Sequence, residues 1–174
     1  MSDFSVTTLA GALSGSVRPR ARSIPEGFAD GAGDAAYFRG PGAIKVEKSE
    51  GKFALVADVK NSAIRRISLD CAYDASLPCT TTTVAGGTMC TCSSYDVLCN
   101  TACGADGDAS TTRFNQPRGL ALTLGGAFAI VVDQINQKVR LMQLSDGNLL
   151  ESKTVAGPTP YQRGFANGVG DAAR

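Results

Sequence analysis

The stretch FNQPRGLALTLGGAFAIVVDQINQKVRLMQL, residues 114–144, occurs in the chain in two related forms and decides the fold. The earlier copy is FRGPGAIKVEKSEGKFALVADVKNSAIRRISL, residues 38–69. The copies are 76 residues apart at Phe38 and Phe114 and 75 residues apart from their aspartates onward, so a single gap aligns them. Repetition at one period predicts a repeat architecture, in which each copy forms one supersecondary unit.

Short runs of β-forming residues, separated by turn residues, fill each copy. A run with the sequence Thr-Val-Ala-Gly follows each copy, and a related run, Val6–Gly11, precedes the first. Short strands joined by Gly-rich turns predict four consecutive antiparallel strands in each repeat and therefore an all-β fold. The expected strands cover residues 43–47, 52–57, 63–69 and 81–86 in the first repeat and 119–123, 127–132, 138–144 and 153–157 in the second.

The composition is that of a globular chain without a strong overall charge. Hydrophobic residues make up 43% of the 174 residues, which is enough for the core of an ordinary single domain. Lysine and arginine number 17 against 16 aspartates and glutamates, so no global field favours nucleic acid or an anionic membrane. No run of about 18 apolar residues is present. We therefore expect neither a nucleic-acid partner nor a membrane span.

Six cysteines lie in the segment from Cys71 to Cys103. Such a density indicates disulfides and an oxidising compartment. The start of the chain, however, lacks the basic and apolar pattern of a signal peptide. These two observations conflict if Met1 is the natural start, so we interpret the chain as an internal segment of a larger protein that is secreted or lies on the cell surface.

Four motifs occur in one order along the chain. They are Phe-x-x-Pro from Phe38, Val-Ala-Asp-x-x-Asn-x-x-Ile-Arg-x-Ile ending at Ile67, Thr-Thr-Val-Ala-Gly ending at Gly86, and Gly-Phe-Ala-Asp-Gly-x-Gly, which starts at Gly27 and returns in similar form at Gly164. This combination resembles the NHL repeat, whose family forms β-propellers that commonly have six blades. The resemblance implies that each repeat is one blade. It covers nearly the whole chain, but the cysteines are not part of the family pattern.

The resemblance divides the chain into parts of a partial propeller that contains about two blades. Residues 1–11 are then the outer strand of a preceding blade, 12–37 an insertion loop, 38–86 a blade, 87–113 a cysteine-rich loop, 114–157 a second blade and 158–174 the start of the next repeat. Two blades cannot close a ring, and open strand edges favour aggregation. We expect the remaining blades to come from more of the same polypeptide, our preferred interpretation, or from partner chains in a higher-order assembly.

The order of cysteines and strands restricts the disulfide pairing. Cys71 and Cys79 precede the strand 81–86, and the other four cysteines follow it. That strand spans about 20 Å, whereas a disulfide requires Cα atoms within about 7 Å of each other. We predict a Cys71–Cys79 disulfide and two further disulfides, which do not join Cys90 to Cys92, among Cys90, Cys92, Cys99 and Cys103. Zinc is the alternative for these four thiols, but their spacing is not that of a zinc site.

Six polar residues hold matching positions in the two repeats and are candidate site residues: Asp58, Asn61, Arg65, Asp133, Asn136 and Arg140. An Asp after a strand accepts backbone hydrogen bonds and tightens a turn, and recurrence in each repeat favours this structural role. The alternative is a ring of carboxylates that binds a cation or a basic ligand. We expect no cofactor. Calcium binding is kept as an alternative for the aspartates of the Gly-rich loops, namely Asp30, Asp34, Asp106, Asp108 and Asp171.

Catalysis receives little support, because the chain has no histidine and cannot itself supply a Ser-His-Asp triad or a His-bound metal. We predict a non-enzymatic, extracellular interaction module, a disulfide-braced propeller that mediates protein–protein contacts or assembly. Its most informative surface is expected on the insertions Ala12–Tyr37 and Gly87–Arg113. Two alternatives stay open: a segment of a secreted propeller hydrolase or lyase whose catalytic residues lie in other blades, and an intracellular RNA-binding NHL propeller.

Overall fold

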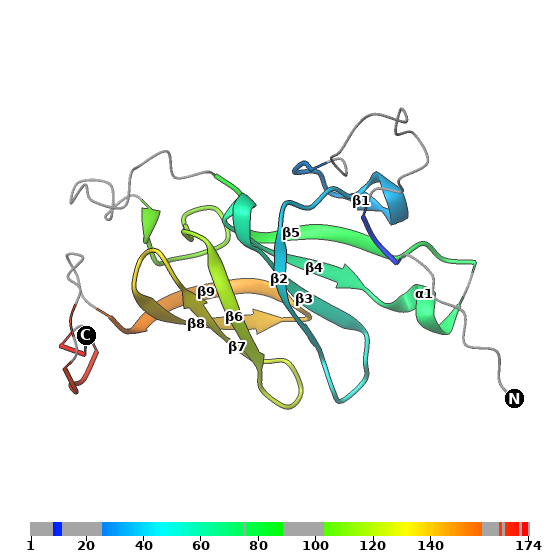
Figure 1. The fold of residues 1–174 in the computed structure, drawn as a ribbon. Helices are drawn as coiled ribbons and strands as arrows, with labels where there is room; N and C mark the ends of the chain where they lie inside the picture. Colours follow the sequence, from blue (N-terminus) through cyan, green and yellow to red (C-terminus); the bar gives the residue numbers. More distant parts are fainter. Residues whose placement is uncertain are drawn as a thin grey trace, which may run out of the picture.

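The structure, a computed structural model, consists of two antiparallel β-sheets that pack against each other (Figure 1). The first sheet has the strand order β1-β5-β4-β3-β2, and the second has the order β6-β7-β8-β9. β2 and β6 lie side by side where the sheets meet. The structure describes residues 9–11, 26–74, 76–88, 103–157, 164, 166–170 and 172–173.

The strands of both repeats lie where the sequence predicts them, so the all-β fold class is confirmed. Four consecutive strands, β2 to β5 and β6 to β9, form each repeat. The bounds are β1 Gly31–Ala32, β2 Pro41–Val46, β3 Phe53–Asp58, β4 Ala63–Ser68, β5 Thr80–Gly86, β6 Pro117–Leu122, β7 Phe128–Asp133, β8 Lys138–Ser145 and β9 Asn148–Ala156. The helical turns are η2 Gly33–Ala35, η3 Val59–Asn61 and α1 Asp70–Tyr73.

Two segments differ from their sequence-based expectation or are described only in part. β9 starts earlier than expected, because Asp146 and Gly147 both adopt positive φ angles, 47° and 74°. This pair forms a tight hairpin turn between β8 and β9. Of the expected strand Val6–Gly11, the structure describes residues 9–11, which form a bend. Within the described residues, no helix has the length and apolar character needed to cross a bilayer.

A disulfide closes the connection between β4 and β5. It joins Cys71 in α1 to Cys79, which directly precedes β5, and the two Cα atoms lie 5.1 Å apart. This is the pair that the sequence predicts. Cys103 is buried and also disulfide-bonded, whereas the other predicted pairs involve Cys90, Cys92 and Cys99, which lie outside the described residues.

Two hydrophobic clusters cover the opposite faces of the first sheet. The larger cluster fills the space between the sheets and includes Leu55 of β3 and Val131 of β7. The smaller one lies on the other face and contains Val56 of β3 together with Ile67 of β4. β3 is therefore buried on both faces, whereas the residues of β7 alternate between buried and exposed. The two strands have nearly the same apolar sequence, so this difference in burial comes from their surroundings and not from their own residues.

A glycine at the end of the fourth strand of each repeat lies against the turn that joins the second and third strands. Gly86 and Gly157 have φ angles of +84° and +110°. A Cβ atom at either position would clash with a backbone carbonyl oxygen, that of Ser62 for Gly86 and that of Gln137 for Gly157. The glycine of the repeated Thr-Val-Ala-Gly motif is therefore required by the close approach of two backbones.

We expect Gly157→Ala to lower the free energy of unfolding by about 1–3 kcal/mol, because an L-residue is strained at this φ and the new methyl group meets backbone. Gly125→Ala is the matched control, since Gly125 has a similar φ of +81° but open space around it. Urea denaturation should show the larger loss for Gly157→Ala. If both variants lose the same free energy of unfolding, the positive φ alone, and not the contact with the Gln137 carbonyl oxygen, accounts for the glycine of the motif.

Candidate functional site

Three repeated polar residues of the second sheet form a buried cluster. Asp133 ends β7, Asn136 lies in the following turn and Arg140 lies in β8; all three are buried. The Asp133 carboxylate accepts hydrogen bonds from Asn136 Nδ2 at 2.8 Å, from Arg140 Nη1 at 3.1 Å and from the Asn115 backbone N at 2.8 Å. The carboxylate therefore connects β8 to the chain that enters β6.

Arg140 extends this cluster to the loop that precedes the second repeat. Its guanidinium donates hydrogen bonds to the carbonyl oxygens of Ala105 at 2.7 Å and Arg113 at 3.0 Å. It also forms an ion pair with Asp106 at 2.6 Å. Asp106 in turn accepts a hydrogen bond from the backbone N of Thr154 in β9 at 2.8 Å. One side chain thus ties the loop to β8 and, through Asp106, to β9.

The first sheet contains the same cluster. Asp58 accepts hydrogen bonds from Asn61 at 2.8 Å and from Arg65 at 3.0 Å. Arg65 forms an ion pair with Asp30 at 2.7 Å, and Asp30 accepts a hydrogen bond from the Thr83 backbone N in β5 at 3.0 Å. We call these two groups the arginine clusters. Their members are Asp30, Asp58, Asn61 and Arg65 in the first repeat and Asp106, Asp133, Asn136 and Arg140 in the second.

Three acidic residues of the Gly-rich loops contact neighbouring protein groups, whereas Asp34 lies exposed in η2. Asp30 and Asp106, which the sequence left open for calcium, pair with the two arginines. Asp108 accepts hydrogen bonds from the Ser110 hydroxyl and other groups of its own turn, and Asp171 lies outside the described residues. In the part of the chain that the structure describes, no group of three or more His, Cys, Asp or Glu side chains could hold a metal ion.

Sequence reasoning did not pair Asp30 and Asp106 with the arginines, and it assigned residues 103–113 to a cysteine-rich loop. The structure shows that these residues support the second sheet, since their carbonyl groups and Asp106 hold Arg140. A signal was present, because the tripeptide Ala-Asp-Gly occurs at residues 29–31 and again at 105–107, at the offset of the two repeats.

The central residues of the arginine clusters are sealed from solvent, whereas the side chains of Asp30 and Asp106 at the edge are 47% and 39% exposed. The side chains of Asp133 and Arg140 are 0% exposed, as are those of Asp58 and Arg65. Burial raises the pKa of Asp133, and hydrogen bonds from Asn136, Asn115 and Arg140 oppose this shift by stabilising the carboxylate. The repeated polar groups therefore bond mainly to the protein, and the buried carboxylates and guanidinium groups are closed to a substrate. Their chemistry is that of a structural tie, because a buried charge requires a partner.

A third buried carboxylate, Glu47, caps the turn between β2 and β3. Its oxygens accept hydrogen bonds from the backbone N atoms of Ser49 at 2.5 Å, Glu50 at 2.9 Å and Gly51 at 3.1 Å, and from the Ser49 hydroxyl at 2.5 Å. These hydrogen bonds, above all that from the Ser49 side chain, lower the pKa of Glu47 from 4.5 to about 2. The ionised carboxylate is therefore the form that holds the turn.

We expect Glu47→Gln to remove a pH-dependent part of the stability. Because the folded-state pKa of about 2 lies below the ordinary value of 4.5, the carboxylate stabilises the fold above about pH 4.5, and this contribution is lost as the pH falls towards 2. Urea denaturation at several pH values should show wild type more stable than Glu47→Gln near neutral pH, with a difference that shrinks towards pH 2. Glu151→Gln, at an exposed carboxylate paired with Lys153, should show little difference at any pH.

One face of the second sheet is apolar and open to solvent. Phe128, Ile130 and Val132 of β7 are 38%, 43% and 44% exposed. Val139 and Leu141 pair with Val132 and Ile130 in β8 and are half-buried on the same face. We call these five residues the Ile130 face. Exposed apolar side chains grouped in this way mark interaction surfaces.

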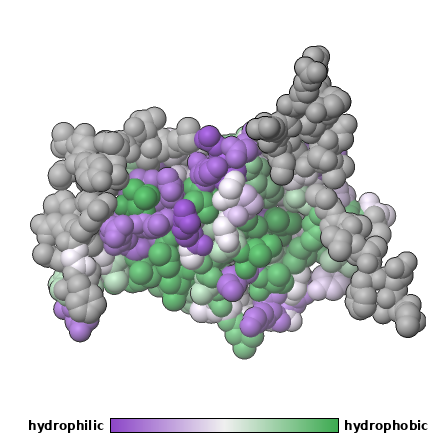
Figure 2. Space-filling model, in the orientation of Figure 1, coloured by the Kyte–Doolittle hydropathy of each residue, from purple (hydrophilic) through white to green (hydrophobic). Residues whose placement is uncertain are grey.

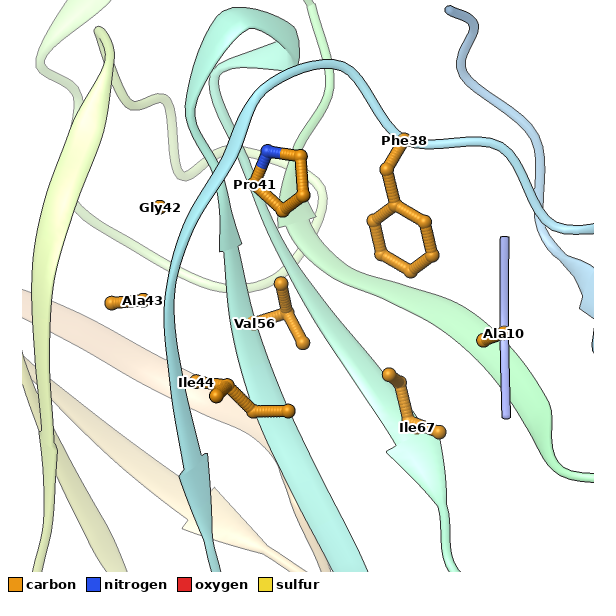
Figure 3. A pocket seen from close by; sticks show the side chains of 8 residues that line it. All are labelled: Ala10, Phe38, Pro41, Gly42, Ala43, Ile44, Val56 and Ile67. Carbon is orange, nitrogen blue, oxygen red and sulfur yellow. The ribbon is translucent and has the colours of Figure 1, made fainter. Parts of the chain in front are cut away.

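The far side of the first sheet carries a second open apolar surface. Ile44 and Val46 of β2 are 57% and 47% exposed. Beside them lies a hollow of about 280 Å³, into which the side chains of Phe38 and Val56 point (Figure 3). Figure 2 shows hydrophobic surface over both sheets. We call Ile44, Val46 and the hollow the Ile44 face. The hollow is lined by Ala10, Phe38, Pro41, Gly42, Ala43, Ile44, Val56 and Ile67.

The fold and the clusters define an all-β protein with two sequence repeats, in which an equivalent buried arginine ties each sheet to the loop that precedes it. No family model matches the chain, and no curated protein matches it. Among solved structures, it resembles a "Putative phosphatase" of Bacteroides thetaiotaomicron, with a TM-score of 0.54 and 19% identity over 80% of this chain and 26% of that one. It also resembles an "auxiliary nutrient binding protein" of the same organism, with a TM-score of 0.52 and 18% identity over 75% of this chain and 28% of that one.

These similarities concern the fold, because the identities are low. The chain spans about a quarter of the length of both solved structures.

Proposed function

We propose that the chain is a non-enzymatic interaction module, built as two consecutive blades of an NHL-type β-propeller, that binds other protein through its sheet faces. The observation that carries this proposal is the contrast between the two repeats. Leu55 and its neighbours in β3 are buried by the second sheet, whereas the equivalent Ile130 and its neighbours in β7 are exposed. A face that the fold covers in one repeat and leaves open in the next is suited to a partner, either another protein or a further blade of the same polypeptide.

The geometry of each repeat supports the blade assignment within this proposal. Each repeat is a four-stranded antiparallel sheet whose strands follow one another in chain order, which is the pattern of a propeller blade. The loop before each repeat is fixed to the third and fourth strands by an arginine cluster. The polar residues that recur are thus used to build the unit, which leaves the apolar faces for recognition.

An extracellular location also belongs to this proposal. The disulfide between Cys71 and Cys79 lies at the edge of the first sheet, and Cys103 is disulfide-bonded beside the second. Structural disulfides persist in oxidising compartments such as the extracellular space and the periplasm. The Cys71–Cys79 disulfide also packs into the cluster that contains Val56 and Ile67, on the outer face of the first sheet.

Site-specific photo-crosslinking tests the interaction role. A photoreactive amino acid at position 130, in protein made by the producing cells, should give cross-links that peptide mass spectrometry maps to defined protein segments. The same group at position 124 is the control, because Leu124 lies in the β6–β7 hairpin and is 81% exposed. Equal cross-linking at both positions, or none at position 130, would rule out the Ile130 face as a binding surface.

A further inference from the structure

We propose that the hollow between the two repeats, at the end where β2 and β6 begin, binds a small organic molecule through an oxyanion group, a phosphate or a carboxylate. This site is separate from the sheet faces on which the proposed function rests. The hollow has a volume of about 410 Å³. Its first wall consists of residues 40–42 and 59–60 of the first repeat, and its second wall consists of Gln116 and Arg118 of the second repeat.

Contacts inside the chain hold the two walls together. β2 and β6 lie side by side where the sheets meet (Figure 1). The backbone N of Gln116 donates a hydrogen bond to the Ser62 hydroxyl of the first repeat at 3.3 Å. Gly42 lies against the turn of its own repeat, since a Cβ atom there would come within 2.8 Å of Val59 Cγ2. The walls of the hollow are therefore set by the junction between the two repeats and do not depend on what covers the outer face of either sheet.

The hollow is positively charged. Of the described residues, Lys60 and Arg118 line it, and no carboxylate does. Lys60 Nζ lies 3.4 Å from a carboxylate oxygen of Glu26, but Glu26 also pairs with Arg39 at 3.2 Å, so one carboxylate serves two cations. Arg118 forms no ion pair with any residue that the structure describes. Two cations that line one hollow with so little neutralisation favour an anionic ligand.

The strands of the repeat do not require the two side chains of the second wall. Gln116 and Arg118 stand where the first repeat has Gly40 and Gly42, and the first repeat forms the equivalent strand with these glycines. The φ angle of Gln116 is 52°, close to the 61° of Gly40, and a side chain is strained in this conformation. A strained side chain that the fold does not need points to a functional role. The role that the position of Gln116 offers is an amide in the wall of the hollow.

The three polar side chains of the hollow supply the donors that an oxyanion requires. Arginine forms paired hydrogen bonds with a phosphate or a carboxylate, lysine adds a compact charge, and the glutamine amide donates further hydrogen bonds. Pro41 and Val59 add apolar surface for the rest of the molecule. The volume of about 410 Å³ lies within the range of small-molecule sites, which is about 300–1,000 Å³. The hollow therefore fits an organic anion and is larger than a bare ion needs.

A nuclear magnetic resonance titration of the purified, isotope-labelled chain tests the site with three probes: glycerol phosphate, malate and glycerol. Glycerol phosphate or malate should shift the side-chain signals of Arg118 and Gln116 in a saturable way, and the anion that binds more tightly identifies the preferred oxyanion. Neutral glycerol should shift neither signal.

Two variants, Arg118→Gly and Gln116→Gly, copy the first repeat and should therefore fold. Arg118→Gly should weaken binding of the anion at least about tenfold, because paired charge-assisted hydrogen bonds are lost. Gln116→Gly should weaken it by a smaller factor. Lys153→Met is the matched control, since it removes an exposed positive charge outside the hollow and should leave the affinity unchanged.

Three outcomes would overturn the proposal. One is the absence of saturable shifts with either anion at concentrations up to about 20 mM, where a site of millimolar affinity would be mostly occupied. The second is equal weakening by Arg118→Gly and Lys153→Met, which would indicate attraction to the overall charge of the chain. The third is binding of glycerol as tight as that of glycerol phosphate, because the hollow would then not recognise the anionic group.

Discussion

Arg140→Met is expected to lower the free energy of unfolding by about 3–5 kcal/mol, because it leaves the Asp133 carboxylate buried without its cation. Asp133 and Arg140 are both 0% exposed and lie 3.1 Å apart. The substitution also removes the hydrogen bonds that Arg140 donates to the carbonyl oxygens of Ala105 and Arg113 in the loop. Equilibrium urea denaturation of the variant, compared with wild type, measures the loss.

Lys153→Met is the matched control for this prediction. Lys153 forms an ion pair with Glu151 at 3.2 Å, but its side chain is 67% exposed, and exposed pairs contribute about 0–1 kcal/mol. A double variant, Asp133→Asn with Arg140→Met, should recover part of the loss, because the buried negative charge is removed with its partner. If Arg140→Met costs no more than Lys153→Met, the cluster does not hold the sheet to its loop.

The sequence predicted the strands well because each strand is a short apolar run between turn residues. This pattern is typical of β-strands and of few other structures. It also predicted that Asp133, Asn136 and Arg140 form a repeated set with a structural role, and in the structure all three are buried. It did not show that Arg140 reaches back to Asp106, since that contact depends on how the preceding loop folds against β8 and β9. The spacing along the chain shows which residues recur. A contact between residues that are 34 positions apart can be predicted only when the path of the loop between them is known.

The open faces could not be read from the sequence for a related reason. The runs from Phe53 to Asp58 and from Phe128 to Asp133 are almost equally apolar, and both are second strands of a four-stranded sheet. One is buried on both faces and the other on one, because exposure depends on what stands beside the sheet. Periodicity within a strand cannot show the presence or absence of that neighbour.

The arginine clusters and the open faces are parts of one arrangement. Each cluster holds the loop before a repeat against the third and fourth strands, and the same loop leads into the first strand at Pro41 or Pro117. The first strand lies at the junction between sheets, where β2 contacts β6. The buried polar groups therefore fix the strands that carry the apolar contacts, so we expect damage to a cluster to weaken the packing between the two sheets as well as the hold on the loop.

Phe114→Ala is expected to lower the free energy of unfolding by about 3–5 kcal/mol, the usual cost of removing a fully buried phenylalanine side chain. Phe114 is 0% exposed and belongs to the cluster between the sheets. Its ring also lies 5.1 Å from the guanidinium carbon of Arg140. The substitution would thus leave a cavity between the sheets and remove an aromatic contact from the buried cation.

Phe38→Ala is the matched comparison, because Phe38 holds the same position in the first repeat and its ring lies 5.0 Å from the guanidinium carbon of Arg65. Phe38, however, lines the open hollow of the Ile44 face and is only partly buried. In urea denaturation, Phe38→Ala should therefore lower the free energy of unfolding clearly less than Phe114→Ala does. Equal costs would show that Phe38 is fully enclosed in the isolated chain, and the Ile44 face would then have no opening to offer a partner.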